Sequence, residues 1–195
     1  MDNSTINAYN QDAQNIADLH SKLIPYRLYE LIDQYFIKGK ASADIGCGIG
    51  RDTSWLSQQG YPCIGIDASN EMLRQANTLY PQEKFIHDYL PELNSISSEN
   101  FQNILCSAVL MHLPKTDIYP ACQNLLRLLK QNGRLIMSFR GTNELNYREK
   151  GKLYEPINID EFSKFFQDQK SEILLNESEI EIKRNLTWHN IVIRK

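Results

Sequence analysis

The chain has 195 residues, of which 42% are hydrophobic and 23% charged, and its formal net charge is −3. This length suits one domain (1–195) with its own core, and the acidic balance argues against binding nucleic acid mainly through phosphates. There is no apolar run of roughly twenty residues, and the polar start is unlike a signal peptide. The four cysteines are scattered, so we expect a reduced cytoplasmic protein with no membrane partner and no bound metal.

The first segment, residues 1–38, is expected to form a helical lid, with two helices within residues 5–38. The second helix carries an apolar stripe at helical spacing, which we interpret as core or lid packing. The stripe consists of Leu23, Ile24, Leu28, Leu31, Ile32 and Phe36.

A core segment, residues 40–140, follows, in which short apolar runs alternate with helical patterns. The predicted strands are 41–45, 62–66, 84–87, 101–106 and 134–139, and the predicted helices are 51–59, 69–79 and 116–130. Gly60 and Gly133 fall just past two of these helices, where a left-handed cap is common. This alternation predicts an α/β fold with a Rossmann-like, doubly wound and mostly parallel sheet.

The alternation of strands and helices ends after the fifth predicted strand. A polar loop, residues 140–156, is expected to contact substrate and leads into a helix near 158–168 within the C-terminal segment 157–195. Two further strand candidates follow, SEILLNESEIEI (171–182) and TWHNIVIRK (187–195). Because no helix separates them, we expect an antiparallel edge pair that completes a seven-stranded sheet.

A glycine-rich stretch, DIGCGIGRD, joins the first predicted strand to the first predicted helix of this core. That position is where a nucleotide-binding turn is found. The glycines are Gly46, Gly48 and Gly50, whereas the dinucleotide pattern GxGxxG would need its last glycine at Arg51. No GK[ST] sequence follows, which excludes a Walker phosphate loop. Cys47 is interpreted as a small filler residue in the turn.

Polar residues recur at the ends of the next three strands. Asp67, Asp88 and Ser107 end the second, third and fourth predicted strands, as Gly46 follows the first. Each acid alone is as readily explained as a helix N-cap. Together they mark the carboxyl ends of four consecutive strands, which is where open α/β sheets bind ligands. We therefore expect a nucleoside to lie across this edge.

The stretches DIGCGIG, GIDAS, HDYL and FQNILCSAVLMHL, within residues 40–140, resemble the successive motifs of class I S-adenosylmethionine-dependent methyltransferases. The resemblance implies S-adenosyl-L-methionine as cofactor and S-adenosyl-L-homocysteine as product. It implies that the glycines lie against the methionine part of the cofactor and that Asp67 holds the ribose. The other cofactor residues implied are Asp44, which orients the glycines, Ala68 and Met72 beside the adenine, Asp88 and Tyr89 at its edge, and Cys47 and Ser107. The C-terminal half resembles small, single-domain bacterial methyltransferases.

Candidates for the chemistry lie next to the fourth strand, in the lid and in the loop 140–156. His112 is the best candidate for a general base, the alternative being a packing or capping histidine. Tyr9, His20, Arg140 and Tyr147 are expected to contact the substrate, with His112. Lys150 and Lys152, in the same loop, are interpreted as solvated surface residues.

The sequence thus predicts methyl transfer by in-line displacement to the oxygen, nitrogen or sulfur of a small molecule. The stretch SAVL stands where amino-methylating enzymes carry a DPPY-like motif, and no basic patch for RNA is present. The oligomeric state is left open. Two alternatives remain at this point: a non-catalytic subunit that binds the cofactor within a complex, and a nicotinamide-dependent oxidoreductase.

Overall fold

The computed structural model describes residues 2–181 and 184–195. Met1 of the predicted lid and Ile182 of a predicted strand lie outside this range. The described strands form a seven-stranded sheet of order β3-β2-β1-β4-β5-β9-β8. Their bounds are β1 Ser42–Ile45, β2 Cys63–Asp67, β3 Lys84–His87, β4 Phe101–Ser107, β5 Leu129–Arg140, β8 Glu172–Glu181 and β9 Leu186–Arg194. Strands β1 to β5 run parallel and β9 is antiparallel to both its neighbours, which confirms the predicted fold class.

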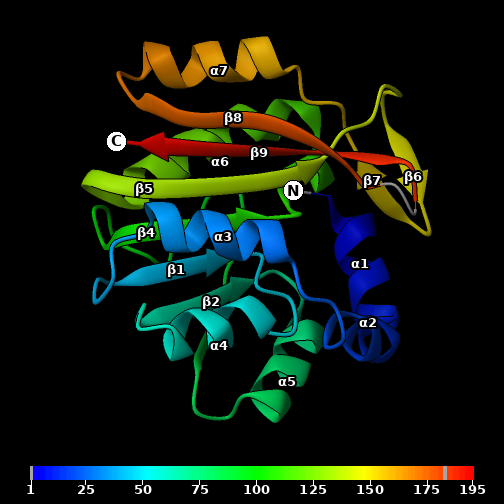
Figure 1. The fold of residues 1–195 in the computed structure, drawn as a ribbon. Helices are drawn as coiled ribbons and strands as arrows, with labels where there is room; N and C mark the ends of the chain where they lie inside the picture. Colours follow the sequence, from blue (N-terminus) through cyan, green and yellow to red (C-terminus); the bar gives the residue numbers. More distant parts are fainter. Residues whose placement is uncertain (1, 182–183) are drawn as a thin grey trace.

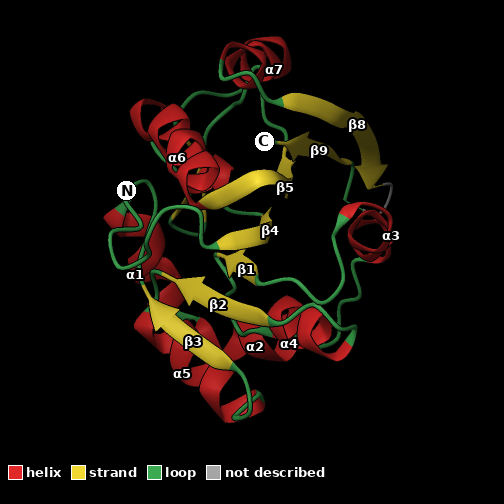
Figure 2. Ribbon diagram, turned by 90° about the vertical axis from the view of Figure 1, so that its left-hand side faces the viewer, coloured by secondary structure: helices red, strands yellow, loops and turns green. Residues whose placement is uncertain are grey.

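Helices cover both faces of the sheet (Figure 2). On one face α3 (Tyr26–Tyr35) and α4 (Arg51–Gln58) bury apolar side chains against β4, β5 and β9. On the same face as α4, α5 (Asn70–Leu79) packs on β3. On the other face lie α6 (Lys115–Leu128) and α7 (Ile159–Asp168). Among the described residues, no helix combines the length and apolarity that a bilayer crossing demands.

The carboxyl edge of the parallel strands is covered by two smaller units, at the right of Figure 1. One consists of α1 (Asn3–Gln11) and α2 (Ala13–His20), and the other is a hairpin of β6 (Tyr147–Glu149) and β7 (Lys152–Tyr154). Arg148 donates to both carboxylate oxygens of Asp2, at 2.8 and 2.9 Å, and the backbone N–H of Leu153 donates to Thr5 Oγ1 at 2.9 Å. We call α1 and this hairpin together the roof.

The segment before β1 contains three helices within residues 2–38, where the sequence predicted two. The additional helix results from a break at Asp12, between α1 and α2. Pro25 stands just before α3, and the residue before a proline is disfavoured in the helical conformation, so α3 begins only at Tyr26. The predicted apolar stripe is therefore divided: Leu23 and Ile24 are exposed in the α2–α3 connection. The rest of the stripe is buried on and just after α3, which is a layer of the fold and not part of the roof.

The loop 140–156 was predicted without strands, but it contains the β6–β7 hairpin. Its two turn residues, Lys150 and Gly151, both have positive φ, 50° and 80°. Such a turn matches the twist of the flanking strands, and Asn-Gly is its usual sequence signal. Because a lysine occupies the first position, the sequence carries no clear hairpin signal.

The predicted left-handed cap at Gly133 is wrong. Helix α6 ends at Leu128 and the chain enters β5 directly, so Gly133 lies inside a strand. The left-handed residue is Asn132, with φ 61°. A Cβ on Gly133 would lie 2.7 Å from Leu129 Cγ, so close packing explains this glycine. At Gly60 the prediction is confirmed, with φ 87° just after α4.

The contrast between Ile32 and Ile24 tests the assignment of α3 to the core. Ile32 is fully buried on α3, whereas Ile24 is 56% exposed just before it. We expect Ile32→Ala to lower the free energy of unfolding by about 2–5 kcal/mol, because it leaves a cavity. Ile24→Ala should change it by less than about 0.5 kcal/mol. Urea unfolding of both variants measures this, and equal effects would contradict the packing described.

Candidate active site

The turn between β1 and α4 is built on glycine. Gly46, Gly48 and Gly50 have φ values of 76°, 55° and 78°. A Cβ on Gly46 would overlap Val109, and one on Gly50 would lie 2.5 Å from Phe85 Cζ. The backbone N–H groups of Gly46 and Cys47 donate to the carbonyl of Ile66, at 2.7 and 3.0 Å. The turn is therefore fixed against β2, with backbone rather than side chains at its surface.

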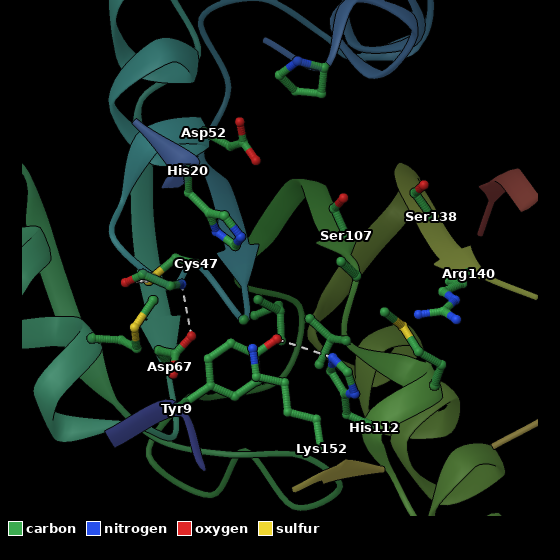
Figure 3. A pocket seen from close by; sticks show the side chains of 18 of the residues that line it. Tyr9, His20, Cys47, Asp52, Asp67, Ser107, His112, Ser138, Arg140 and Lys152 are labelled. Carbon is green, nitrogen blue, oxygen red and sulfur yellow. Dashed lines mark hydrogen bonds between the residues drawn. The ribbon is translucent and has the colours of Figure 1, made fainter. Parts of the chain in front are cut away.

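Asp67, the last residue of β2, joins two turns. Its carboxylate accepts the N–H of Gly48 at 2.8 Å and the N–H of Ser69 at 2.8 Å (Figure 3). Burial raises the pKa of Asp67 above its ordinary value, and these two backbone hydrogen bonds act in the opposite direction. Asp67 as a whole is half-buried, and it lines a cavity at the carboxyl edge of the sheet.

This cavity has a volume of about 720 Å³ and is lined by most of the predicted site residues. Those that line it are Tyr9, His20, Gly46, Cys47, Gly48, Asp67, Ala68, Met72, Asp88, Tyr89, Ser107, His112 and Arg140. Three other predicted residues, Asp44, Gly50 and Tyr147, are not part of its lining. The ring of Tyr147 lies 6.0 Å from that of Tyr154, which does line it.

Asp44 lies beneath the glycine turn. It is 3% exposed and accepts a hydrogen bond from Thr53 Oγ1 at 2.8 Å. Burial, and then the nearby carboxylate of Asp52, raise the pKa of Asp44 well above its ordinary value. Asp44 therefore links β1 to α4 and does not line the cavity.

Asp88 and Tyr89 differ in exposure. Asp88 is 7% exposed, and its carboxylate accepts the N–H groups of Tyr89 and Ser95 at 2.7 and 2.8 Å and the hydroxyl of Ser95 at 2.5 Å. It thus holds the chain that follows β3 in a compact turn. Tyr89 is 44% exposed at the cavity margin.

His112, which ends the short 3₁₀ helix η1 (Leu110–His112), is paired with Tyr9 of the roof. Its Nδ1 lies 2.5 Å from the carbonyl oxygen of Leu153, and its Nε2 lies 3.1 Å from Tyr9 Oη (Figure 3). Burial lowers the pKa of His112 to about 4, so the ring is neutral near pH 7. Because a carbonyl only accepts, the proton is on Nδ1 and the lone pair of Nε2 accepts from the Tyr9 hydroxyl.

Of the two lysines in the loop 140–156 that were interpreted as solvated, Lys152 is not exposed. Lys152 is half-buried, with Nζ 4.1 Å from the centre of the Tyr9 ring, and the structure gives it no ion pair with any described residue. Burial lowers its pKa. Lys150 is exposed, as expected. Arg140 donates to Glu149 at 2.6 Å, and its guanidinium lies 4.6 Å from the centre of the Tyr154 ring.

Sequence reasoning missed several lining residues. Ser138 on β5 and Asn190 and Trp188 on β9 line the cavity beside Arg140, and Tyr154 joins them from the hairpin. Nothing in the sequence singled out Ser138 or Asn190, since both stand within apolar strands. In the part of the chain that the structure describes, no three His, Cys, Asp or Glu side chains gather as a metal site requires.

Comparison with known proteins agrees with this site. Residues 43–137 match the model of the methyltransferase domain family. A putative methyltransferase of Geobacillus is 26% identical over 60% of this chain and 49% of its own length. The ubiquinone biosynthesis O-methyltransferase of Coxiella burnetii is 29% identical over 58% of this chain and 49% of its own. The structure of the Burkholderia thailandensis 1,6-didemethyltoxoflavin-N1-methyltransferase superimposes with a TM-score of 0.80, at 17% identity, over 98% of this chain and 87% of that one.

Residues 43–137, about half of the chain, thus match the methyltransferase domain family, and the whole fold is that of Rossmann-like methyltransferases. The family model covers the strands β1 to β4, the glycine turn and most of β5. The chain spans about half the length of the curated relatives that it matches.

The buried state of His112 can be tested through the pH dependence of stability. Its pKa is 6.5 in model peptides and about 4 in the folded chain, so between these values the unfolded chain binds more protons. The free energy of unfolding should therefore fall as the pH is lowered, by about 2 kcal/mol between about pH 7 and pH 5 from this group alone.

Urea unfolding at the two pH values measures this loss, which should become smaller in His112→Gln. Replacement of the exposed His87 by Gln is the matched control. An NMR titration of the wild-type imidazole gives an independent measurement. A midpoint for His112 near 6.5 would contradict the description given above.

Proposed function

We propose that the protein transfers the methyl group of S-adenosyl-L-methionine to an oxygen, nitrogen or sulfur atom of a small molecule. One observation carries this proposal: a single cavity is lined at the same time by the glycine turn with Asp67 and by the neutral His112–Tyr9 pair. A ligand held at the first group has the second within the same enclosed space. S-adenosyl-L-homocysteine would be the product.

The residues at the glycine turn fit this cofactor. Asp67 accepts two backbone N–H groups and is partly exposed, so its carboxylate retains lone pairs for the two ribose hydroxyls. Met72 lies beside the turn as an apolar surface for a base. Asp67 and Asp88 give this part of the cavity an acidic character, which suits a sulfonium cation and requires no phosphate cradle. When bound, the cofactor supplies an electrophilic methyl group.

We further propose that His112 acts as the general base through Tyr9. Tyr9 Oη would receive the acceptor's proton while it passes its own proton to Nε2 of His112, and Leu153 O would hold the resulting imidazolium at Nδ1. A histidine with a pKa of about 4 is a weak base. Such a base is sufficient because an O–H or N–H proton becomes much more acidic as the new bond to carbon forms. The charge of Lys152 near Tyr9 would favour an acceptor that carries negative charge.

Two relatives support a small-molecule acceptor. The Burkholderia enzyme is named for a toxoflavin precursor, and the Coxiella enzyme for a step of ubiquinone biosynthesis. The remaining roles of His20, Arg140 and Tyr147 are proposed as contacts to the acceptor. Of these, His20 and Arg140 line the cavity.

The cofactor assignment predicts the effect of removing the Asp67 carboxylate. We expect Asp67→Ala to weaken binding of both S-adenosyl-L-methionine and S-adenosyl-L-homocysteine by roughly 10-fold or more, because hydrogen bonds to a charged group are among the stronger ones. Calorimetric titration measures this, with Glu71→Ala on α5 as the matched carboxylate control. The unfolding midpoint of each variant should be recorded alongside.

The same titration separates the alternatives. Binding of NADH in place of S-adenosyl-L-methionine would overturn the proposal in favour of an oxidoreductase. Tight cofactor binding with no homocysteine product for any acceptor tested would favour a non-catalytic subunit. Formation of the product with a small-molecule acceptor is the result that we expect.

The base assignment predicts a separate effect on rate. With an acceptor found in that screen, His112→Gln should lower kcat by roughly 10²-fold or more, while cofactor affinity stays within roughly 2-fold. Tyr9→Phe should lower kcat in the same way, because it removes the bridging hydroxyl. An unchanged kcat in both variants would mean that alignment alone drives the transfer.

A further inference from the structure

Three polar side chains form a row across neighbouring strands at the acceptor end of the cavity. Ser107 on β4 is paired with Ser138 on β5, and Ser138 is paired with Asn190 on β9. Side chains at paired positions lie on the same face of a sheet, and adjacent strands are about 4.8 Å apart. The row, which we call the polar row, therefore spans about 10 Å. All three residues line the cavity.

The hydrogen-bonding groups of the polar row are largely unused by the protein. Ser138 is only 7% exposed, and neither its hydroxyl nor that of Ser107 has a hydrogen-bond partner among the described residues. In Figure 3 both hydroxyls extend into the same open part of the pocket. Ser107 is half-buried, so both hydroxyls face the cavity without a protein partner and are available to a ligand or to water.

Asn190 has a defined orientation. It is 2% exposed, and its Nδ2 donates to Glu177 at 3.2 Å and to Glu179 at 3.4 Å. Because carboxylates accept, the amide nitrogen must face them and Oδ1 is left as an acceptor. The polar row thus offers two hydroxyls, which can donate or accept, followed by one carbonyl oxygen that requires a donor.

Apolar side chains line the same cavity. Leu23, Ile24 and Tyr26 are 46%, 56% and 71% exposed. The chain at this point is anchored by Arg27, which binds both carboxylate oxygens of Glu177 at 2.7 and 2.8 Å. On the strand side, Trp188, two residues before Asn190, lies on the same face of β9 and adds a flat apolar surface. A cavity with a polar row and flat apolar surfaces fits a ring that has a polar edge and apolar faces.

We propose that the polar row recognises the methyl acceptor, and that the acceptor is a planar heterocycle with hydrogen-bonding atoms along one edge. This inference rests on the proposed function and specifies its substrate class. The edge must include at least one N–H or O–H for Asn190 Oδ1, and it can present carbonyl or ring-nitrogen acceptors to the hydroxyls of Ser107 and Ser138. Fused pyrimidine rings have this pattern.

The test uses lumazine, a pteridine-dione, as the probe. The wild-type protein is first saturated with S-adenosyl-L-homocysteine, followed by calorimetry, and then titrated with lumazine, followed by its fluorescence. We expect saturable binding that Ser138→Ala weakens by roughly 2- to 12-fold, the loss of one neutral hydrogen bond. Ser107→Ala should weaken it similarly.

Ser178→Ala is the matched control. This serine lies on β8, its hydroxyl is 2.7 Å from His189 Nδ1, and it does not line the cavity. It should bind lumazine as the wild type does. Phosphoethanolamine, a flexible anion without a ring, is titrated in parallel and should not compete with lumazine.

The outcomes are distinguishable from those of the proposed function. If S-adenosyl-L-homocysteine binds but lumazine does not, or if phosphoethanolamine binds in its place, the heterocycle proposal is overturned and the cofactor assignment stands. If Ser138→Ala binds lumazine as tightly as Ser178→Ala does, the polar row is not the recognition element. If S-adenosyl-L-homocysteine itself fails to bind, the proposed function and the inference that rests on it are both overturned.

Discussion

The carboxylate of Asp67 connects the turn after β1 with the turn after β2, through the N–H groups of Gly48 and Ser69. The backbone at the glycine-turn end of the cavity depends on this connection. Gly46 and Gly48 adopt positive φ without strain, but glycine loses much conformational entropy on folding, and the hydrogen bonds to the carbonyl of Ile66 and to Asp67 offset part of this cost. A single acidic residue therefore organises the backbone that would otherwise leave several N–H groups without partners.

The part of the cavity around His112 has a different origin, since it is made by segments far apart in the chain. The roof brings Tyr9 to His112, although the two residues are separated by 103 positions. Within the roof, Arg148 forms an exposed ion pair with Asp2, the backbone N–H of Leu153 donates to Thr5, and Lys152 lies over the Tyr9 ring. Exposed ion pairs contribute little free energy, so the roof depends mainly on its packing and on that backbone contact.

The sequence predicted those features that depend on local signals. The parallel core, the glycine turn and Asp67 follow from apolar runs, glycine spacing and strand ends, and the fold class is confirmed. Features that depend on pairing between distant strands were not accessible. The alignment of Ser138 with Asn190 follows from the register of β5 with β9, which no local pattern encodes. The half-buried position of Lys152 likewise follows from a hairpin turn whose first residue is a lysine.

The hydrogen bond from His112 to the main-chain oxygen of Leu153 affects which substitutions around the pocket the site can accept. A backbone carbonyl is present whatever side chain stands at position 153. Most substitutions in the hairpin therefore leave the imidazole of His112 in the same tautomer. The neighbouring positions, Lys152 and Tyr154, can then change the shape and charge of the pocket while the proton-accepting nitrogen keeps its direction. The shape of this part of the pocket and the orientation of His112 can therefore change independently of each other.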